Sequence, residues 1–300
     1  MNILPYIFVL FAAMLWGTVG TTQTFLQEGV SPIAVAATRS LIGGGILLIA
    51  ALAMRKINFK TWSWKWTILA ALTIALFQCL FFTSVRFTGV AVGTVVTIGS
   101  SPVFSGIIEL LFWKRKPSRV WGIATLLAIV GCILLFVNKG EATVDPIGVL
   151  LALSAGVMFA LYTNCSKQLT EKEETLPAVA MTFTICALIL LPFSQIGVTW
   201  VFDGGNLLPM LFMALAATSL AYLFYLAGLE KIGSSSAVTL SLAEPLTASL
   251  LGVFLVGEYL SPTSWIGVAM LLGGIVVLTF GGRKVVQASV EPTSVVEDVS

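Results

Sequence analysis

A glutamate and a proline stand side by side in the apolar stretch LSLAEPLTASLLG, residues 240–252. Glu244 is the only charged residue between Lys231 and Glu258, so it lies far along the chain from other charges. A carboxyl group in this position could bind a substrate ammonium group, exchange a proton, or act as a neutral hydrogen-bonded group. Because burial disfavours the ionised form of a carboxyl group, it suits the last two roles better. The sequence alone leaves all three roles open.

The composition indicates that the surroundings of this stretch are a membrane. Of the 300 residues, 58% are hydrophobic and only 10% are charged, and the mean hydropathy is +1.01. Soluble domains carry about 25% charged residues, and a helix needs about 20 mainly apolar residues to cross a bilayer. We therefore predict an all-α membrane protein with ten transmembrane helices, at residues 4–23, 32–54, 66–85, 88–112, 119–137, 147–166, 177–198, 207–228, 234–256 and 262–281.

Pro245 has a structural consequence within such a helix. Proline lacks an amide hydrogen and clashes with the preceding turn, so we expect the helix to bend or open near residues 241–245. Lipid cannot satisfy the carbonyl groups freed in this way, whereas the nearby hydroxyls of Ser241 and Thr247 could. A glutamate at the bilayer centre is also costly unless it faces protein or water. Both residues are therefore predicted to face the bundle interior beside a polar cavity.

Basic residues are distributed unevenly over the predicted loops. Thirteen Lys and Arg residues, Lys167 among them, fall on the side of the N-terminus, against Arg86 and Lys139 on the other side. Because such an excess marks the cytoplasmic side, we expect both termini in the cytoplasm and a multi-pass protein of the plasma membrane, the inner membrane of a bacterium. Glu109, close in sequence to Lys114, is interpreted as a residue of the cytoplasmic membrane interface.

The chain also contains an internal repeat. Residues 89–136 and 233–280 align over some 48 positions, with Pro102 matching Pro245 and an offset of 143–145 residues throughout. We therefore expect two five-helix repeats, residues 1–140 and 141–282, followed by a disordered cytoplasmic tail over residues 283–300. Because five is odd, the second repeat must enter the membrane from the opposite side. Such inverted-topology repeats are typical of transporters.

In these features the chain resembles the drug/metabolite transporter superfamily, in its ten-helix EamA-type branch. The resemblance rests on Trp16–Gly17, on TRSLIGGG (38–45), on the paired proline-containing helices, and on the exit sequence GEYLSPTSWIG (257–267). The first copy, FWKRKPSRVWG (112–122), lacks the Gly-Glu pair of that exit, which weakens the case for a chemical role of Glu258. The resemblance covers the chain to about residue 280. It implies export of amino acids or related metabolites.

Arg39 is the only basic residue inside a predicted helix. It lies about 10 Å inside the outer end of its helix, at 1.5 Å per residue from Pro32, so its side chain could snorkel to the headgroups. The resemblance implies instead a recurrent structural arginine at this place. We therefore interpret Arg39 as a structural charge, in preference to a substrate contact.

The candidate substrate-binding residues are small, polar or aromatic residues in the middle of predicted helices. Stripes of small residues fit close helix packing as well as the lining of a cavity, and the larger side chains could instead bond or pack across helices. Together they describe an aromatic cavity with few charges, which suits an apolar or aromatic zwitterion better than a sugar phosphate. The candidates are Trp16, Gly17, Gln78, Phe82, Thr97, Ser100, Pro102, Tyr162, Tyr222, Tyr225, Ser241, Glu244 and Pro245.

Other classes of function fit the sequence poorly. The chain has no histidine, which excludes Ser-His dyads, histidine metal sites and histidine acid/base chemistry. Its aspartates, Asp145, Asp203 and Asp298, lie in predicted loops or the tail, and there is no Walker A sequence. A channel would be expected to show rings of like residues, whereas the two halves differ at Glu244 and its counterpart Ser101. An intramembrane enzyme or a channel is therefore disfavoured.

We predict a monomeric secondary transporter that works by alternating access around a midplane cavity. Its expected partners are a small-molecule substrate and the lipid bilayer, with no cofactor, metal or nucleic acid. The predicted substrates are amino acids, aromatic or other apolar ones included, or related metabolites. Transport of a sugar, a nucleotide-sugar or a drug by the same fold is the alternative.

Overall fold

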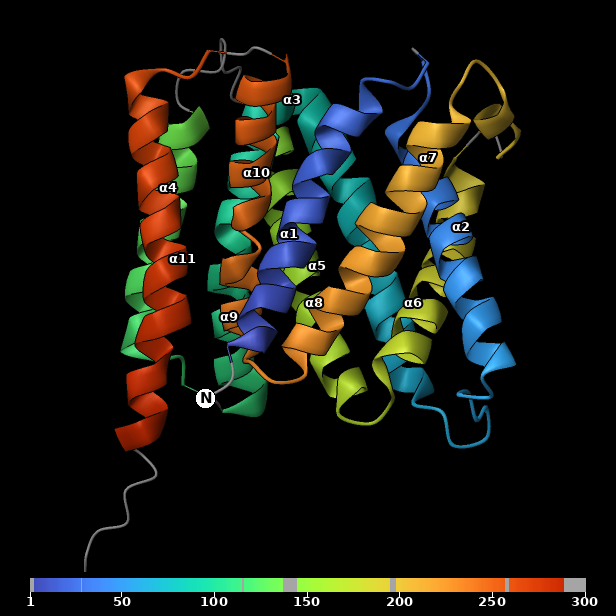
Figure 1. The fold of residues 1–300 in the computed structure, drawn as a ribbon, viewed down its shortest axis with the longest axis horizontal. Helices are drawn as coiled ribbons and strands as arrows, with labels where there is room; N and C mark the ends of the chain where they lie inside the picture. Colours follow the sequence, from blue (N-terminus) through green and yellow to red (C-terminus); the bar gives the residue numbers. More distant parts are fainter. Residues whose placement is uncertain are drawn as a thin grey trace, which may run out of the picture.

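The computed structural model describes residues 3–27, 29–114, 116–136, 145–194, 198–256 and 259–288. Within these ranges the chain forms helices and loops, with no strand, and the helices stand side by side (Figure 1). The helices of the first half are α1 (Leu4–Gln23), α2 (Pro32–Ala53), α3 (Trp64–Trp113) and α4 (Arg119–Phe136). Those of the second half are α5 (Pro146–Thr170), α6 (Thr175–Leu190), η1 (Leu191–Phe193), η2 (Thr199–Phe202), α7 (Leu207–Ala214), η3 (Leu215–Leu220), α8 (Ala221–Leu229), α9 (Ser234–Leu240), α10 (Ala243–Leu251), η4 (Gly252–Val256) and α11 (Pro262–Ala288).

The predicted all-α membrane architecture is confirmed. Among the described residues, nine helical segments are long and apolar enough to cross a bilayer, and Arg119–Leu135 forms a shorter tenth. Several boundaries differ from the predicted ones, most clearly at two helix ends. The helix predicted at residues 177–198 is α6, which ends at Leu190, before Pro192. α11 continues to Ala288, beyond the predicted end at 281. Residues 289–300 of the predicted tail and Glu258 lie outside the described residues.

A glycine separates the third and fourth spans. α3 contains two spans, Trp64–Val90 and Val92–Trp113, with a break at Gly89, where φ is 77° and ψ is 164°. This backbone conformation is accessible to glycine and strained for other residues. The break therefore takes the place of the short loop expected between residues 85 and 88.

The two halves of the chain make matching contacts. α1 packs against α8 and α10 of the second half, and α5 packs against both spans of α3 in the first half. α2 packs against α6, and α4 packs against α11. In Figure 1 the α4–α11 pair and the α2–α6 pair lie at opposite sides of the bundle, with α1, α3, α5, α8 and α10 between them. The centre of the molecule is thus built from both halves.

The α4–α11 pair shows how closely these helices approach. A Cβ atom at Gly131 would lie 2.7 Å from the carbonyl oxygen of Gly267, and a Cβ atom at Gly267 would lie 2.6 Å from that of Gly131. In a bilayer, helices associate through such close packing because lipid provides no hydrophobic driving force between them. The contact is reciprocal, and at the repeat offset of 143 residues its counterpart is Gly274 against Ala124, where a Cβ atom at Gly274 would lie 2.7 Å from the Ala124 carbonyl oxygen.

The break predicted near Pro245 is present. α9 ends at Leu240 and α10 begins at Ala243. The carbonyl oxygen of Ser241, which Pro245 cannot bond, accepts from the Glu244 amide at 2.9 Å, and Ser241 Oγ donates to the Ala237 carbonyl oxygen at 3.1 Å. Pro102, the counterpart of Pro245 in the first repeat, lies inside α3 without such a gap.

Candidate functional site

Glu244 lies at the start of α10, next to the gap between α9 and α10. α9 is buried apart from Ser236, whereas Glu244 and Thr247 keep part of their surface accessible. Within the described part of the chain, the Glu244 carboxylate forms no side-chain hydrogen bond. The amide groups at a helix start favour a negative charge, which lowers the cost of placing a carboxylate there. Glu244 is therefore a central acidic group with bonding capacity to spare.

Gly17 brings α1 directly against this part of α10. A Cβ atom at Gly17 would lie 2.7 Å from the Glu244 carbonyl oxygen and 2.7 Å from Thr247 Cβ. The first repeat has the matching contact, where a Cβ atom at Gly156 of α5 would lie 2.9 Å from the Thr97 carbonyl oxygen of α3. Each repeat thus places a glycine against the helix of the other repeat within a few residues of its proline. The close backbone approach expected at Gly17 is what the structure shows.

Arg39 points into the bundle. Its Nη2 donates to Gln78 Oε1 at 3.0 Å, and Gln78 is buried. The guanidinium also lies within electrostatic reach of the Glu244 carboxylate and of the Tyr222 hydroxyl. The cost of burying each charge is reduced by the opposite charge nearby. The structure therefore gives an inward position rather than a snorkelling one.

Aromatic side chains gather beside these two charges, both of which act on Tyr222. The Trp16 ring centroid lies 4.8 Å from that of Tyr222 and 5.0 Å from that of Tyr225, and Tyr222 lies 4.2 Å from Phe183. The Tyr225 hydroxyl is fixed by a 2.8 Å hydrogen bond with Thr163 Oγ1. We call this group the aromatic cluster; it comprises Trp16, Phe77, Phe159, Tyr162, Phe183, Tyr222 and Tyr225.

Trp16, like Tyr162 of the same cluster, has a buried polar atom without a hydrogen-bond partner among the described residues. In Trp16 this atom is the Nε1 donor. A buried donor without a partner is costly, and most such groups in proteins are satisfied. The Trp16 indole is thus available to bond a molecule that enters the aromatic cluster.

Three of the predicted residues lie instead on the contact between α3 and α5. Thr97 Oγ1 donates to the Ala152 carbonyl oxygen of α5 at 3.1 Å, Ser100 Oγ donates to the Thr97 carbonyl oxygen at 3.2 Å, and Pro102 is buried beside them. Close helix packing accounts for this position. Phe82 is partly buried and packs on Phe81, 5.4 Å between ring centroids. A substrate-binding role for these four residues stays a prediction.

Phe77, Phe159 and Phe183 were missed by the sequence reasoning. Each lies in a helix rich in apolar residues, and nothing in the sequence separates a phenylalanine that faces the centre from one that faces lipid. Phe159 lies 6.1 Å from Trp16 and 5.2 Å from Phe77, between ring centroids. Its position three residues before Tyr162 on one helix face is the only signal that could have found it.

Ten apolar helices among the described residues, in two matching halves, with Arg39, Glu244 and aromatic side chains inside the bundle, define a multi-pass membrane transport protein. The sequence model of the EamA-like transporter family matches residues 3–137 and again residues 146–280, so the chain belongs to that family. The chain is a transporter and not an enzyme. The two separate matches also support the duplication inferred from the sequence.

Relatives and a solved structure agree with this assignment. The chain is 45% identical over 279 residues to the uncharacterized transporter YwfM of Bacillus subtilis, covering 93% of this chain and 94% of that protein. It is 29% identical over 188 residues to the threonine/homoserine exporter RhtA of Escherichia coli, covering 61% of each. A crystal structure superposes with a TM-score of 0.81 at 18% identity, over 94% of this chain and 98% of that one, which shows the shared fold.

Proposed function

We propose that this transporter exports amino acids or related small zwitterions by alternating access through the centre of the bundle. The observation that carries the proposal is that Glu244 and Arg39, which the sequence suggested as a structural charge, both act on Tyr222 of the aromatic cluster; we propose that Arg39 contacts the substrate as well. An α-amino acid carries a carboxylate, which a guanidinium binds well, and an ammonium group, which a carboxylate binds. Its apolar side chain can pack on the rings, and the ammonium group also favours a ring face.

The same geometry disfavours the alternative substrates. A sugar phosphate or nucleotide-sugar carries two or more negative charges and calls for several cationic groups around them. Among the described residues, Arg39 is the one basic residue whose charge acts on a tyrosine of the aromatic cluster. A neutral sugar would require a lining rich in hydrogen-bond donors and acceptors rather than in aromatic rings. The similarity to a threonine/homoserine exporter supports an amino-acid substrate as well.

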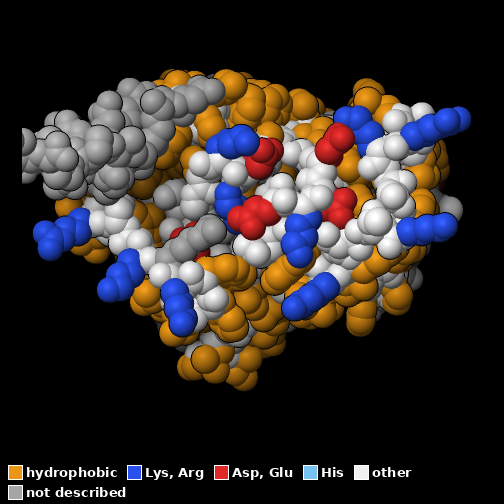
Figure 2. Space-filling view, turned by 90° about the horizontal axis from the view of Figure 1, so that it is seen from below, with side chains coloured by type: hydrophobic (Ala, Val, Ile, Leu, Met, Phe, Trp, Pro, Cys, Tyr) orange, Lys and Arg blue, Asp and Glu red, His pale blue; other side chains and the backbone are white. Residues whose placement is uncertain are grey.

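We propose that the two repeats are inverted relative to each other, and alternating access follows from this arrangement. α1 begins at the lower end of the bundle and α5 at the upper end in Figure 1, so the two halves run in opposite directions. Inverted repeats of this kind have two related packings, each open to one side of the membrane. We assign the lower face to the cytoplasm, where Lys and Arg side chains are spread (Figure 2), and the protein to a bacterial inner membrane.

Purified protein in proteoliposomes tests this function. A panel of radiolabelled amino acids, with a nucleotide-sugar and a neutral sugar beside them, is assayed with and without a pH gradient. We expect at least one apolar or aromatic amino acid to move, and Arg39→Gln to move it more than tenfold more slowly, the loss expected for a charge-assisted hydrogen bond. Lys172→Met, a change at an exposed lysine, is the control.

Movement of sugars alone would contradict the substrate class. Transport by Glu244→Gln equal to wild type at every pH would exclude Glu244 as a proton-coupling group.

A further inference from the structure

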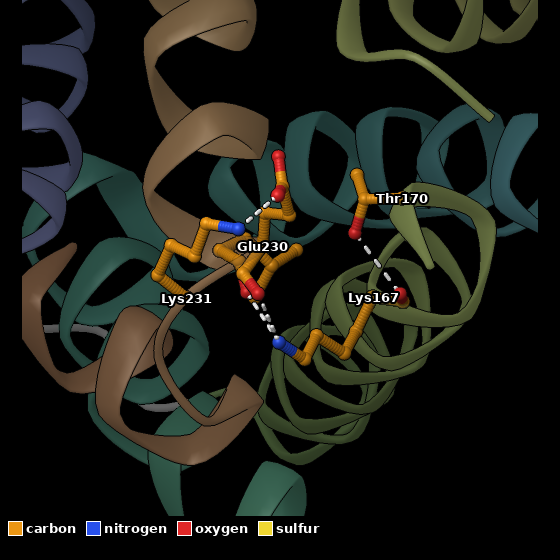
Figure 3. A network of polar contacts seen from close by, with 5 residues as sticks. Lys167, Thr170, Glu230 and Lys231 are labelled. Atoms are coloured by element: carbon orange, nitrogen blue, oxygen red, sulfur yellow. Dashed lines mark hydrogen bonds and ion pairs between the residues drawn. The ribbon is translucent and has the colours of Figure 1, made fainter. Parts of the chain in front are cut away.

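Two buried charged side chains hold the turn that joins α8 to α9. Lys167 of α5 donates from Nζ to the carbonyl oxygens of Leu229 at 2.8 Å and Glu230 at 2.9 Å (Figure 3). These carbonyl groups end α8, where a positive charge is favoured. The Glu230 side chain pairs with Lys231, whereas the backbone carbonyl oxygen of Glu230 accepts from Lys167.

Glu109 of α3 binds the other side of the same turn. Its two carboxylate oxygens accept from the backbone amides of Ser234 at 2.8 Å and Ser235 at 3.3 Å, the first residues of α9. Lys167 is 9% exposed and Glu109 is 6% exposed. Glu109 is therefore a capping residue in the bundle and not the membrane-interface residue that its neighbours in the sequence suggested. Lys167, expected on a loop, belongs to the last turns of α5 and is buried.

The helices around these contacts enclose the lower half of the bundle. Every residue of α5 from Tyr162 to Lys167 is buried, which is more than one full turn, so this part of α5 is covered on all sides. α9 is buried except for Ser236. Above the gap before α10, by contrast, Glu244, Thr247 and Ala248 retain accessible surface. The described helices therefore close the bundle below the aromatic cluster.

We infer that Lys167 and Glu109 form the lower gate of the transport path. For a substrate to leave the aromatic cluster towards the lower face, the α8–α9 turn must move away from α5 and α3. That movement breaks the hydrogen bonds of both side chains and leaves two charges without their partners. The inference rests on the proposed alternating access, to which it adds the residues that keep one side shut.

The other repeat lacks the corresponding carboxylate. At the repeat offset of 143 residues that relates Pro102 to Pro245, the counterpart of Glu109 is Gly252. The break at Gly89 corresponds to the α8–α9 turn. Because Gly252 has no side chain, it cannot accept hydrogen bonds from the amides at that break as Glu109 does at the α8–α9 turn. Among the described residues, this carboxylate-to-amide fastening therefore holds the α8–α9 turn and has no counterpart at the Gly89 break.

Hydrogen–deuterium exchange of the full chain in lipid nanodiscs, without substrate, tests the gate. The variants are Lys167→Met and Glu109→Gln, with Lys172→Met as the control, because Lys172 is an exposed lysine near the end of the same helix. We expect the opening equilibrium to rise about ten- to a hundredfold in either gate variant, as the loss of charge-assisted hydrogen bonds implies. Exchange over residues 229–241 should rise accordingly. Exchange at the upper ends of α1 and α10 should fall, since opening one side closes the other.

The outcomes separate a gate from a merely structural contact. If exchange rises at both faces, the variant has loosened the fold and the gate assignment is wrong. If neither face changes in either variant, the fastening has no role in the equilibrium. Because Glu109→Gln keeps the shape of the side chain, it still decides the matter should Lys167→Met fail to fold. The assay uses no substrate, so a wrong substrate class would leave its result unchanged.

Discussion

The contact of α1 with α10 makes a sharp prediction at Gly17. Replacing this glycine by alanine adds one methyl group, 2.7 Å from the Glu244 carbonyl oxygen and from Thr247 Cβ. The Glu244 carbonyl oxygen is part of the backbone and cannot rotate aside as the end of a flexible side chain can. The added methyl group therefore forces α1 to move away from α10. Gly20, one turn later on the same helix, provides the matched control, since a Cβ atom there would have no neighbour within 4 Å.

The magnitude follows from comparing the two substitutions. Both remove one glycine from α1, so the change in helix propensity is common to them and cancels in the difference. What remains is the overpacking at Gly17, about 1–3 kcal/mol in the free energy of unfolding. In a protein of this size that corresponds to a fall in Tm of about 2–10 °C for Gly17→Ala relative to Gly20→Ala.

Thermal unfolding of the purified variants in detergent, followed by tryptophan fluorescence, measures this difference. The account expects Gly20→Ala to unfold at or above the temperature of the wild type and Gly17→Ala well below it. Transport should fall in Gly17→Ala as well, because the displaced helix carries Trp16 away from the aromatic cluster. Equal unfolding temperatures for the two variants would refute the close α1–α10 contact.

Two further predictions concern the centre of the bundle. Arg39→Lys keeps the positive charge but loses the planar group that bonds Gln78, so transport in proteoliposomes should fall more than tenfold; unchanged rates would mean that charge alone suffices. Trp16→Phe keeps an aromatic ring beside Tyr222 and Tyr225 but removes the unpartnered Nε1 donor. The variant should unfold at nearly the wild-type temperature with weaker substrate binding, about tenfold for one hydrogen bond, and wild-type affinity by calorimetry would show that the donor makes no substrate contact.

The helices could be predicted from the sequence because one physical rule decides them. A run of about 20 apolar residues crosses a bilayer, and the chain consists almost wholly of such runs. The gap before α10 was also predictable, since Pro245 lacks the amide hydrogen that a continuous helix requires. The duplication could be recognised because Pro102 and Pro245 recur in similar surroundings.

Contacts between distant parts of the chain could not be predicted in the same way. Arg39 and Gln78 were each picked out as polar residues within apolar helices, but their hydrogen bond depends on how α2 and α3 are rotated about their axes. Glu109 was assigned by its neighbour Lys114, whereas its bond joins it to an amide 125 residues away. Uniformly apolar helices carry too weak a pattern to show which face meets protein, so the members of the aromatic cluster from different helices could be seen together only in the structure.

The central claim is that Arg39 and Glu244 together recognise a zwitterion. The most direct test compares three labelled compounds in proteoliposomes: an apolar amino acid that the wild type transports, its amide, which lacks the carboxylate, and its deaminated acid, which lacks the ammonium group. The account predicts that the wild type transports the amino acid and moves both analogues at least tenfold more slowly. The Arg39→Gln variant should lose the preference for the amino acid over its amide, because the amide lacks only the carboxylate. It should keep the preference over the deaminated acid. Equal transport of all three compounds by the wild type would contradict it.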